Sequence, residues 1–407
     1  MRKNIFFFAA LAVFGFVAQS CTNDDVQNGN EAPQAAQYIR FSNPLMDGMN
    51  ATRAASTTAD VMNVADEEMD VIGYYANDVA TAAQQGIQYV GVSNAPITLK
   101  YGAAWDYKNP ADMSFWPGGN IYFQAVYPST HTGVVANPTA VAEKTPQLNR
   151  TVTIQSDAAN QIDLVFGDAV ANSGTVGLVF KHGLSKIDFN AQMLTSTMSA
   201  RIKDVKIHNV YEQANVGFLG AVSGQKRDLS VSGYTTLAAA NSFDAGITEK
   251  AVAAYDPDDN PVTDLMADGG SLILMPQTTA LMTADSKALI PAWGTTNGTA
   301  VPLTTADNAA SLATYFELDV YLETQDGTIL LGSKDATDPE NIEYTYAKVY
   351  IPFQANWAQG TKYTYTFQIG AGTGGYKADG TPIFAPISYT VTSVADWTDG
   401  GNTNKSF

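Results

Sequence analysis

Few side chains in this 407-residue chain have the types and spacing that catalysis or metal binding requires. Its three histidines are His131, His182 and His208, and none stands at a metal-ligand spacing or beside a nucleophile motif. The context of His182 favours a hydrogen-bonded structural histidine at a strand end over a catalytic base. Glycosidases use a pair of carboxylates, but no motif in this sequence singles out any two acidic residues as such a pair. We therefore expect no enzyme activity, no cofactor and no metal.

Two other patterns resemble ligand sites but lack an essential part. Asp256, Asp258 and Asn260 have the alternating oxygen spacing of a calcium loop, but a proline follows where the sharp turn needs glycine. A solvated acidic turn is the better interpretation. Gly370–Gly375 satisfies the dinucleotide glycine pattern, but Tyr376–Pro382 cannot supply the helix that would hold a pyrophosphate. We interpret it as a flexible loop.

Composition narrows the class of protein. The chain carries 40 acidic and 22 basic side chains, for a net charge of −18. Such acidity repels phosphate backbones, so no nucleic-acid partner is expected. Thr, Tyr, Val, Phe and Gly are plentiful while Lys and Glu are scarce, which favours strands in an exported chain. The fold class is therefore expected to be all-β, held together by burial and strand pairing because only one cysteine is present.

The first residues have the features of a lipoprotein signal peptide. Arg2-Lys3 precedes the apolar stretch Ile5–Ala18, which is too short for a membrane span but long enough for a signal sequence. Cys21, the only cysteine, stands where signal cleavage would leave an N-terminus ready for acylation. Residues 1–21 are therefore predicted to form the lipoprotein signal region, cleaved before Cys21, which is the predicted lipidation site.

A second processing signal follows a short strand-like run. After the polar tether Thr22–Gln37, the alternation around Arg40 predicts that Ile39 and Phe41 point inward from one face of a strand. The small, polar residues around Arg53 then have the character of an exposed, cleavable loop. Residues 22–53 are therefore interpreted as a propeptide.

The remainder contains many short strand-like segments separated by Gly, Pro and Asn. Its length exceeds one comfortable hydrophobic core, and the small-residue stretch Gly167–Gly174 suggests a boundary. A pair of β-sandwiches fits the strand spacing, with an N-terminal domain over residues 54–172 and a C-terminal domain over residues 173–407. The expected strands are Val71–Tyr75, Ile97–Tyr101, Ile121–Tyr127, Ile162–Phe166, Val176–Phe180, Ile187–Ala191, Val205–Val210, Ser271–Met275, Tyr315–Glu323, Tyr346–Ile351, Tyr363–Ile369 and Ile387–Val391.

Taken in order, several segments resemble the fimbrillin family, the two-domain lipoprotein pilins of Bacteroidales-type outer membranes. The resemblance covers nearly the whole chain. Its segments are the Cys21 signal, Thr52–Ala54, Val71–Ala76, Phe115–Pro117, Tyr122–Pro128, Val179–Lys186, Gly360–Ile369 and Val394–Trp397.

This resemblance implies two transthyretin-like β-sandwich domains in tandem and export as a lipid-anchored precursor. It also implies that an arginine-specific protease cuts between Arg53 and Ala54, releasing the Cys21 anchor and the Tyr38–Ser42 strand. The implied location is the cell outer membrane, in a fimbrium, with other pilin subunits as partners and a host protein or glycan as receptor.

The residues themselves suggest how trimming would lead to assembly. If Ile39 and Phe41 fill a groove, their removal exposes an unpaired sheet edge that another subunit's strand can fill. Polymerising members of the family carry a C-terminal donor strand, but Thr398–Phe407 is polar and a poor strand. Either Ile387, Tyr389 and Val391 belong to the donor strand, or the subunit does not donate, as expected of a tip or accessory pilin.

An anchored surface glycan-binding lipoprotein is the alternative. Aromatic rings stack on sugar faces, so exposed tryptophans gathered on one face would favour it, although buried tryptophans are the commoner outcome. The tryptophans are Trp105, Trp116, Trp293, Trp357 and Trp397.

Overall fold

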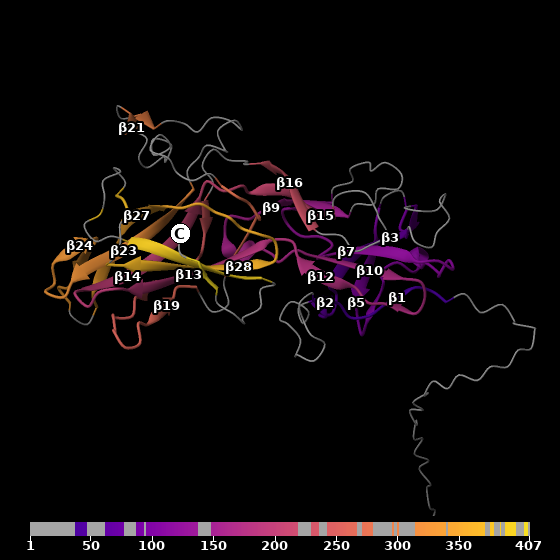
Figure 1. Ribbon diagram of the computed structural model, residues 1–407, viewed down its shortest axis with the longest axis horizontal. Helices are drawn as coiled ribbons and strands as arrows, with labels where there is room; N and C mark the ends of the chain where they lie inside the picture. The colour runs from indigo at the N-terminus through magenta and orange to yellow at the C-terminus, as the bar shows by residue number, and fades with distance from the viewer. Residues whose placement is uncertain are drawn as a thin grey trace, which may run out of the picture. The chain divides into compact units, whose positions relative to one another are not determined.

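The computed structural model describes a chain built almost entirely of strands (Figure 1). The described residues are 37–46, 62–76, 87–92, 95–136, 148–218, 229–235, 242–266, 271–279, 295–296, 299–300, 314–338, 341–370, 375–377, 383, 387–395 and 403–405. Two short 3-10 helices, η1 (Pro110–Asp112) and η2 (Ala158–Asn160), interrupt them. The predicted all-β class is confirmed. Within these ranges no helix has the length and apolar character that crossing a membrane requires.

The N-terminal half is organised around an eight-stranded sheet. Its order is β2-β12-β10-β7-β3-β5-β6, with β4 also paired to β3. The strands are β2 (Leu45–Met46), β3 (Glu68–Tyr75), β4 (Gln88–Val90), β5 (Ile97–Tyr101), β6 (Trp105–Tyr107), β7 (Ile121–Tyr127), β10 (Val165–Ala171) and β12 (Val179–His182). Beside this sheet, β1 (Arg40–Phe41) pairs in parallel with β11 (Thr175–Val176).

Strand β7 is buried along its whole length because both of its faces are covered. On one face, Ile121, Phe123 and Tyr127 belong to the first hydrophobic core. On the other, Val126 belongs to a larger core that continues into the C-terminal half. A strand covered on both faces can be apolar at every position, which is why this run lacks alternation.

A four-stranded sheet covers the second face of β7. Its order is β16-β15-β9-β8, formed by β8 (Val134–Ala136), β9 (Asn149–Thr153), β15 (Gln213–Phe218) and β16 (Leu229–Thr235). Arg150 in β9 reaches Asp70 in β3, with Nη2 2.5 Å from Oδ2. Because Arg150 is 2 % exposed, this ion pair is a buried polar link between the two sheets.

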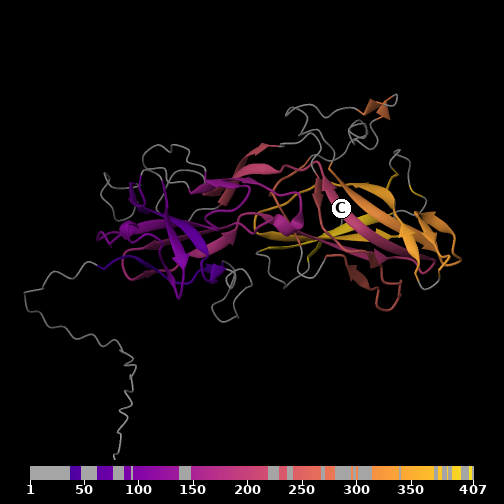
Figure 2. The same ribbon diagram turned by 180° about the vertical axis from the view of Figure 1, so that it is seen from behind.

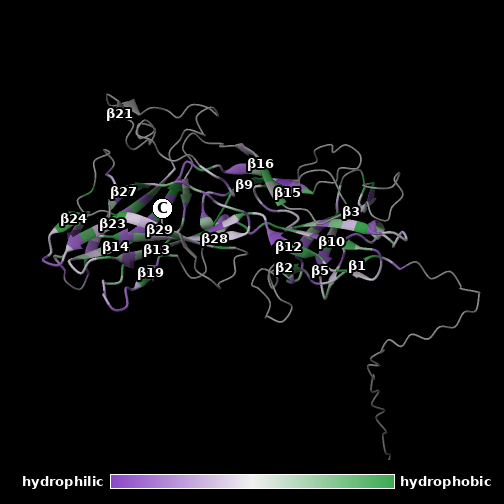
Figure 3. Ribbon diagram, viewed as in Figure 1, coloured by the Kyte–Doolittle hydropathy of each residue, from purple (hydrophilic) through white to green (hydrophobic). Residues whose placement is uncertain are grey.

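The C-terminal half consists of two six-stranded sheets. One contains β13 (Ser185–Met193), β19 (Val262–Asp264), β20 (Leu272–Leu274), β28 (Thr361–Ile369), β29 (Ile387–Ala395) and β30 (Thr403–Lys405). The other contains β14 (Met198–His208), β17 (Ser242–Asp244), β18 (Lys250–Ala251), β23 (Tyr315–Thr324), β24 (Ile329–Leu331) and β27 (Ala347–Pro352). Two small hairpins are β21 (Thr295–Thr296) with β22 (Thr299–Ala300), and β25 (Ser333–Asp335) with β26 (Glu343–Thr345). Hydrophobic and hydrophilic stretches alternate along many of these strands (Figure 3), as expected where one face is buried.

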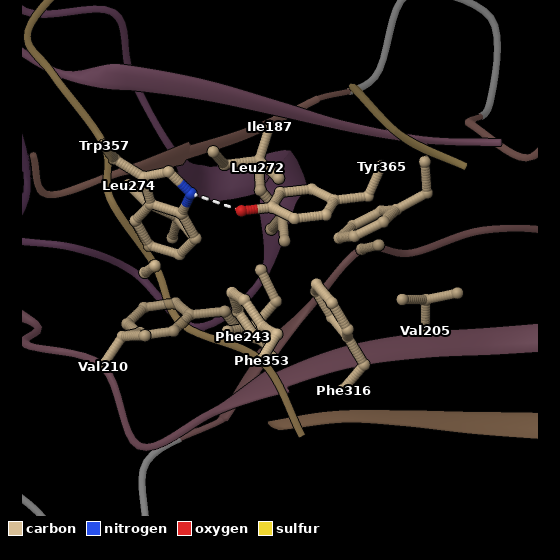
Figure 4. Close-up of a cluster of buried hydrophobic side chains, with 14 of the residues drawn as sticks. Ile187, Val205, Val210, Phe243, Leu272, Leu274, Phe316, Phe353, Trp357 and Tyr365 are labelled. Atoms are coloured by element: carbon tan, nitrogen blue, oxygen red, sulfur yellow. Dashed lines mark hydrogen bonds between the residues drawn. The ribbon is translucent and has the colours of Figure 1, made fainter. Parts of the chain in front are cut away.

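Aromatic side chains fill the core of this half (Figure 4). Phe316 and Phe353 stack with their ring centroids 3.8 Å apart. Trp357 donates its ring N–H to the Tyr365 hydroxyl at 2.9 Å, so neither polar atom is left unpaired in the apolar interior.

The predicted strand Ile162–Phe166 is shifted along the chain. The observed strand, β10, continues through Gly167 to Ala171, part of the stretch that was taken for a boundary. A Cβ at Gly167 would stand 2.8 Å from the ring of Phe180, so the absence of a side chain lets the neighbouring strand pack closely. The small residues serve packing inside a strand. A run of small residues is equally typical of a linker, so the sequence pattern cannot distinguish the two.

The division into domains at residues 172 and 173 stays a prediction, as does the transthyretin-like topology. Strands that follow this division pair with strands that precede it: β12 with β10 and β2, β11 with β1, and β15 with β9.

Candidate functional site

Residues 38–46, here called the N-terminal segment, are built into the first hydrophobic core. Ile39 is 0 % exposed and Phe41 is 5 % exposed, while Arg40 between them faces solvent. Pro44 and Met46 are also buried, and Leu45 is exposed. The indigo segment containing β1 and β2 lies beside magenta strands of the first sheet in Figure 1 and, from behind, in Figure 2.

Main-chain hydrogen bonds hold the segment on two sides. On one side, the N–H of Ile39 donates to the carbonyl of Ser114 at 2.8 Å. On the other, the N–H of Ser42 donates to the carbonyl of Val176 at 3.0 Å, and that of Leu45 donates to the carbonyl of Leu178 at 3.0 Å. The segment therefore lies as an extra strand between residue 114 and the edge formed by residues 175–180. We call that edge, Thr175–Phe180, the partner edge.

Phe41 occupies an aromatic site. Its ring packs edge-on against Phe123, with centroids 5.8 Å apart, and against Tyr107 at 6.3 Å. Trp116 packs edge-on against the same Phe123 ring at 6.0 Å, and its N–H donates to the carbonyl of Gly174 at 3.2 Å. Edge-to-face contacts at these separations are favourable beyond the buried area alone. Phe41 thus contacts the aromatic part of the first core directly.

Tyr107 connects the site to the main chain of the segment. Its hydroxyl donates to the carbonyl of Ile39 at 3.1 Å and accepts the N–H of Ser114 at 3.4 Å. Burial raises the pKa of Tyr107 to about 12. The hydroxyl therefore keeps its proton at neutral pH and remains a donor to whatever carbonyl lies at this position.

This arrangement binds a strand and has no reactive group. Four buried side chains, Ile39, Phe41, Pro44 and Met46, face the core, and a large apolar side chain gains roughly 1.5–3 kcal/mol on full burial. The segment is attached by few hydrogen bonds because β1 and β2 are each only two residues long. Burial of apolar side chains is accordingly the main interaction that holds the segment in place.

The predicted processing residues lie outside the described residues. This applies to Cys21, Arg53 and Ala54, so lipidation and cleavage stay predictions.

The candidate donor residues lie in a strand that is fully paired within this chain. Ile387, Tyr389 and Val391 belong to β29, which pairs antiparallel with β28 from Ile387 to Ala395. Ile387 is 0 % exposed and Val391 is 9 % exposed. Donating β29 to another subunit would require that this pairing be broken first. Its role as a donor stays a prediction.

Each histidine has a structural neighbour. His182 Nδ1 lies 2.9 Å from Asp163 Oδ1, and His208 Nε2 lies 3.1 Å from Glu317 Oε2. His131 Nδ1 lies 2.9 Å from the adjacent Thr132 carbonyl. In the part of the chain that the structure describes, no three His, Cys, Asp or Glu side chains are grouped as metal ligands.

Asp256, Asp258 and Asn260, which have the spacing of a calcium loop but were interpreted as an acidic turn, form a turn closed by its own hydrogen bonds. The N–H of Asp258 donates to Asp256 Oδ1 at 2.9 Å, and the N–H of Asn260 donates to the Asp256 carbonyl at 2.7 Å. Asn260 adopts a positive φ of 46°. One of the carboxylate oxygens that a cation would need is thus used within the turn.

The described tryptophans are fixed inside the fold. Trp105 and Trp357 are 3 % and 4 % exposed, and Trp116 is half-buried. Trp105 donates to Asn63 Oδ1 at 3.0 Å, so all three ring N–H groups have an acceptor. Trp293 and Trp397 lie outside the described residues.

Sequence reasoning missed the residues that receive the segment. Tyr107 and Ser114 were not singled out, and Val176–Phe180 was expected only as a strand, without its pairing to the segment. The contact between Ser42 and Val176 joins positions 134 residues apart. Parallel pairing over such a separation leaves no local pattern. Tyr107, in contrast, ends the short strand β6, whose alternation of buried and exposed residues can be read from the sequence.

The geometry defines an all-β protein whose first core is completed by a strand from its own N-terminal region. The chain belongs to the fimbrillin-like family, whose family model matches residues 52–384. Membership places the protein among the subunits of cell-surface fimbriae and adhesion structures, which assemble with other pilin subunits. A search of curated proteins gives no match.

Solved structures from Bacteroides and Parabacteroides species are similar at low sequence identity. A fimbrial protein from Bacteroides vulgatus is 15 % identical with a TM-score of 0.49, covering 88 % of this chain and 98 % of its own. A candidate cell adhesion protein from Bacteroides ovatus is 15 % identical with a TM-score of 0.38, covering 90 % and 100 %. One from Parabacteroides distasonis is 9 % identical with a TM-score of 0.39, covering 89 % and 100 %. Because these TM-scores are below 0.5, nothing about this chain is inferred from the structural similarity. The family assignment rests on the sequence match.

Proposed function

We propose that the protein is a structural or adhesive subunit of a fimbria that is exported as a lipoprotein precursor. Cys21 carries the lipid that anchors the precursor in the outer membrane, and a protease then cuts between Arg53 and Ala54. The observation that carries the proposal is the burial of Ile39 and Phe41 in the first core. Both precede Arg53, so the cut separates a core strand from the chain whose core it completes.

Loss of the N-terminal segment would leave an open groove. The carbonyls of Ser114, Val176 and Leu178 would lose their donors, and the sites of Ile39 and Phe41 would be exposed. An unpaired edge beside empty apolar sites is a template for another strand. A strand from a neighbouring subunit fills it by donor-strand exchange, gaining main-chain hydrogen bonds and side-chain burial together.

The extent of the family match supports a separable segment. It begins at residue 52, whereas the N-terminal segment ends at Met46. The segment therefore lies outside the part of the chain that is matched to the family.

The position of the subunit in a fimbria follows from whether it donates a strand. A stalk subunit must both accept and donate, but β29 is paired with β28 along its whole length. The tail that was expected to be a poor strand pairs with β29 through Thr403–Lys405. An acceptor groove without a free donor among the described strands fits a tip or accessory subunit. We therefore favour that role over a stalk role.

An assembly assay with an Arg53→Ala variant tests the proposal. The wild-type protein should lose its N-terminal residues at the cell surface and enter high-molecular-weight assemblies that resist mild denaturation. The variant should stay unassembled and lipid-anchored. An Arg40→Ala variant is the matched control, because Arg40 is exposed on the segment and should assemble normally. Normal assembly of the Arg53→Ala variant would refute the proposal.

The alternative, an anchored glycan-binding lipoprotein, predicts a mature N-terminus at an acylated Cys21 and binding to glycans without trimming. The described tryptophans give it no exposed platform, because Trp105 and Trp357 are buried and Trp116 is half-buried.

A further inference from the structure

The N-terminal segment does not pair regularly with the partner edge. Phe41 pairs with Val176, and Leu45 pairs with Val179. Between these two pairs the segment advances four residues, from 41 to 45, while the partner edge advances three, from 176 to 179. The segment therefore contains one extra residue, which is the definition of a β-bulge.

The hydrogen bonds show the same mismatch. The donors on the segment, Ser42 and Leu45, are three residues apart, but their acceptors, Val176 and Leu178, are two apart. Two consecutive residues, Ser42 and Asn43, face solvent, so the inward positions change from 39 and 41 to 44 and 46. Pro44 follows the bulge. Proline has no N–H to donate, and no hydrogen bond to the partner edge is required from this position.

The extra residue belongs to the segment and not to the partner edge. That edge consists of β11 and β12 with Gly177 and Leu178 between them, yet the alternation of buried and more exposed side chains continues across the junction: Val176, Leu178 and Phe180 are buried, Gly177 is exposed and Val179 is half-buried. A regular strand laid against it would point every second side chain inward and would keep one donor opposite each available carbonyl.

We propose that the N-terminal segment is an imperfect occupant of the partner edge, which is built to receive a strand without the extra residue. That strand presents apolar side chains at positions i, i+2, i+4 and i+6. The inference rests on the proposed function, since the incoming strand belongs to another subunit. The inference also explains why exchange would favour the incoming strand. A regular strand replaces a bulged segment that pairs over only two short stretches.

Tyr107 sets the register of the incoming strand. Its hydroxyl donates to the carbonyl of the residue in the first inward position, which is Ile39 in the precursor. A slip by one residue would turn every apolar side chain to the solvent face. The candidate donor residues Ile387, Tyr389 and Val391 match the first three positions, but the polar Ser393 does not match the fourth, in keeping with a subunit that does not donate.

Deleting Asn43 from the intact precursor tests the inference without requiring exchange. The deletion removes the extra residue while Phe41 can still pair with Val176 and Leu45 with Val179. We expect amide hydrogen exchange at Ser42 and Leu45 to slow roughly fivefold, as for one added hydrogen bond. The length-preserving control, Asn43→Ala, should leave exchange unchanged, and an alanine inserted after Asn43 should accelerate it. Faster exchange in the deletion variant would overturn the inference.

Peptides separate this inference from the proposed function. Precursor cut after Arg53 is mixed with a labelled peptide of residues 37–47, either complete or lacking Asn43. The shorter peptide should displace the resident segment at a roughly fivefold lower concentration. If neither peptide enters while the deletion still slows amide exchange, strand exchange is refuted and the regular edge stands. If both enter equally and the deletion does not slow exchange, the inference is refuted and strand exchange stands.

Discussion

The hydroxyl of Tyr107 donates to the carbonyl of Ile39, 68 residues earlier in the chain. The same hydroxyl accepts the N–H of Ser114, whose own carbonyl accepts the N–H of Ile39. One side chain in β6 therefore holds both the N-terminal segment and the loop that flanks it. The segment is a component of the first core in the precursor, and its stability can be measured through this contact.

Replacing Tyr107 with phenylalanine should destabilise the precursor by about 1–1.5 kcal/mol, because the ring stays while the hydrogen bond is lost. The carbonyl of Ile39 and the N–H of Ser114 would both lack their partner. Urea denaturation measures this loss of unfolding free energy. The same substitution should change a trimmed, unassembled protein less, since no segment carbonyl is present. An equal loss of unfolding free energy in both forms would mean that Tyr107 does not act through the carbonyl of Ile39.

Truncating Phe41 to alanine should cost about 3–5 kcal/mol, the range for removing a buried phenylalanine. Its ring is buried and contacts Phe123 and Tyr107. Thermal or urea denaturation of the precursor measures the effect. Arg40→Ala is the control on the same strand, expected within about 0.5 kcal/mol because Arg40 is exposed. Similar values for the two variants would mean that the segment is not part of the core in solution.

Breaking the ion pair of Arg150 and Asp70 from one side should be strongly destabilising. Arg150 is 2 % exposed, and its Nη2 lies 2.5 Å from Asp70 Oδ2, so Asp70→Ala leaves a buried cation without its partner. The expected cost is about 3–5 kcal/mol. The double variant Asp70→Leu with Arg150→Met should be markedly more stable than Asp70→Ala, because no charge remains buried. If the double variant is no better, packing rather than charge governs this contact between β3 and β9.

Acid should weaken the C-terminal half through Glu317. Hydrogen bonding to His208, followed by Lys348, lowers the pKa of Glu317 from 4.5 to about 2. A carboxyl whose folded pKa is depressed contributes stability above its unfolded pKa, and this contribution is lost as pH falls from about 4.5 toward 2. The contribution is at most about 3 kcal/mol. Unfolding measured across this range should show a shallower pH dependence in Glu317→Gln, and an unchanged slope would contradict the assignment.

The sequence predicted the parts of the site that depend on local pattern. The single alternation of Ile39 and Phe41 indicated two inward side chains, and the structure buries both. Pro44 and Met46 escaped notice because the bulge at Ser42–Asn43 moves the inward positions out of step with that alternation. The strand Val176–Phe180 was expected, but its pairing with the segment could not be predicted, since that pairing is parallel and joins residues more than a hundred positions apart.

The extent of the strands was harder to predict where small residues serve packing. Gly167 was grouped with a linker, yet it lies in β10 so that the ring of Phe180 can pack against it. The buried pair of Arg150 and Asp70 was equally invisible, because neither residue has a local sequence signal for its partner. Such contacts are set by how sheets stack, which depends on residues far apart in the chain.

The central claim is that the N-terminal segment is a temporary part of the first core. N-terminal sequencing, combined with mass spectrometry of the protein recovered from surface assemblies, tests it most directly. The account predicts a mature N-terminus at Ala54 and no residues from 38–46 in the assembled material. Assembled subunits that begin at an acylated Cys21 and retain Ile39 and Phe41 would contradict it.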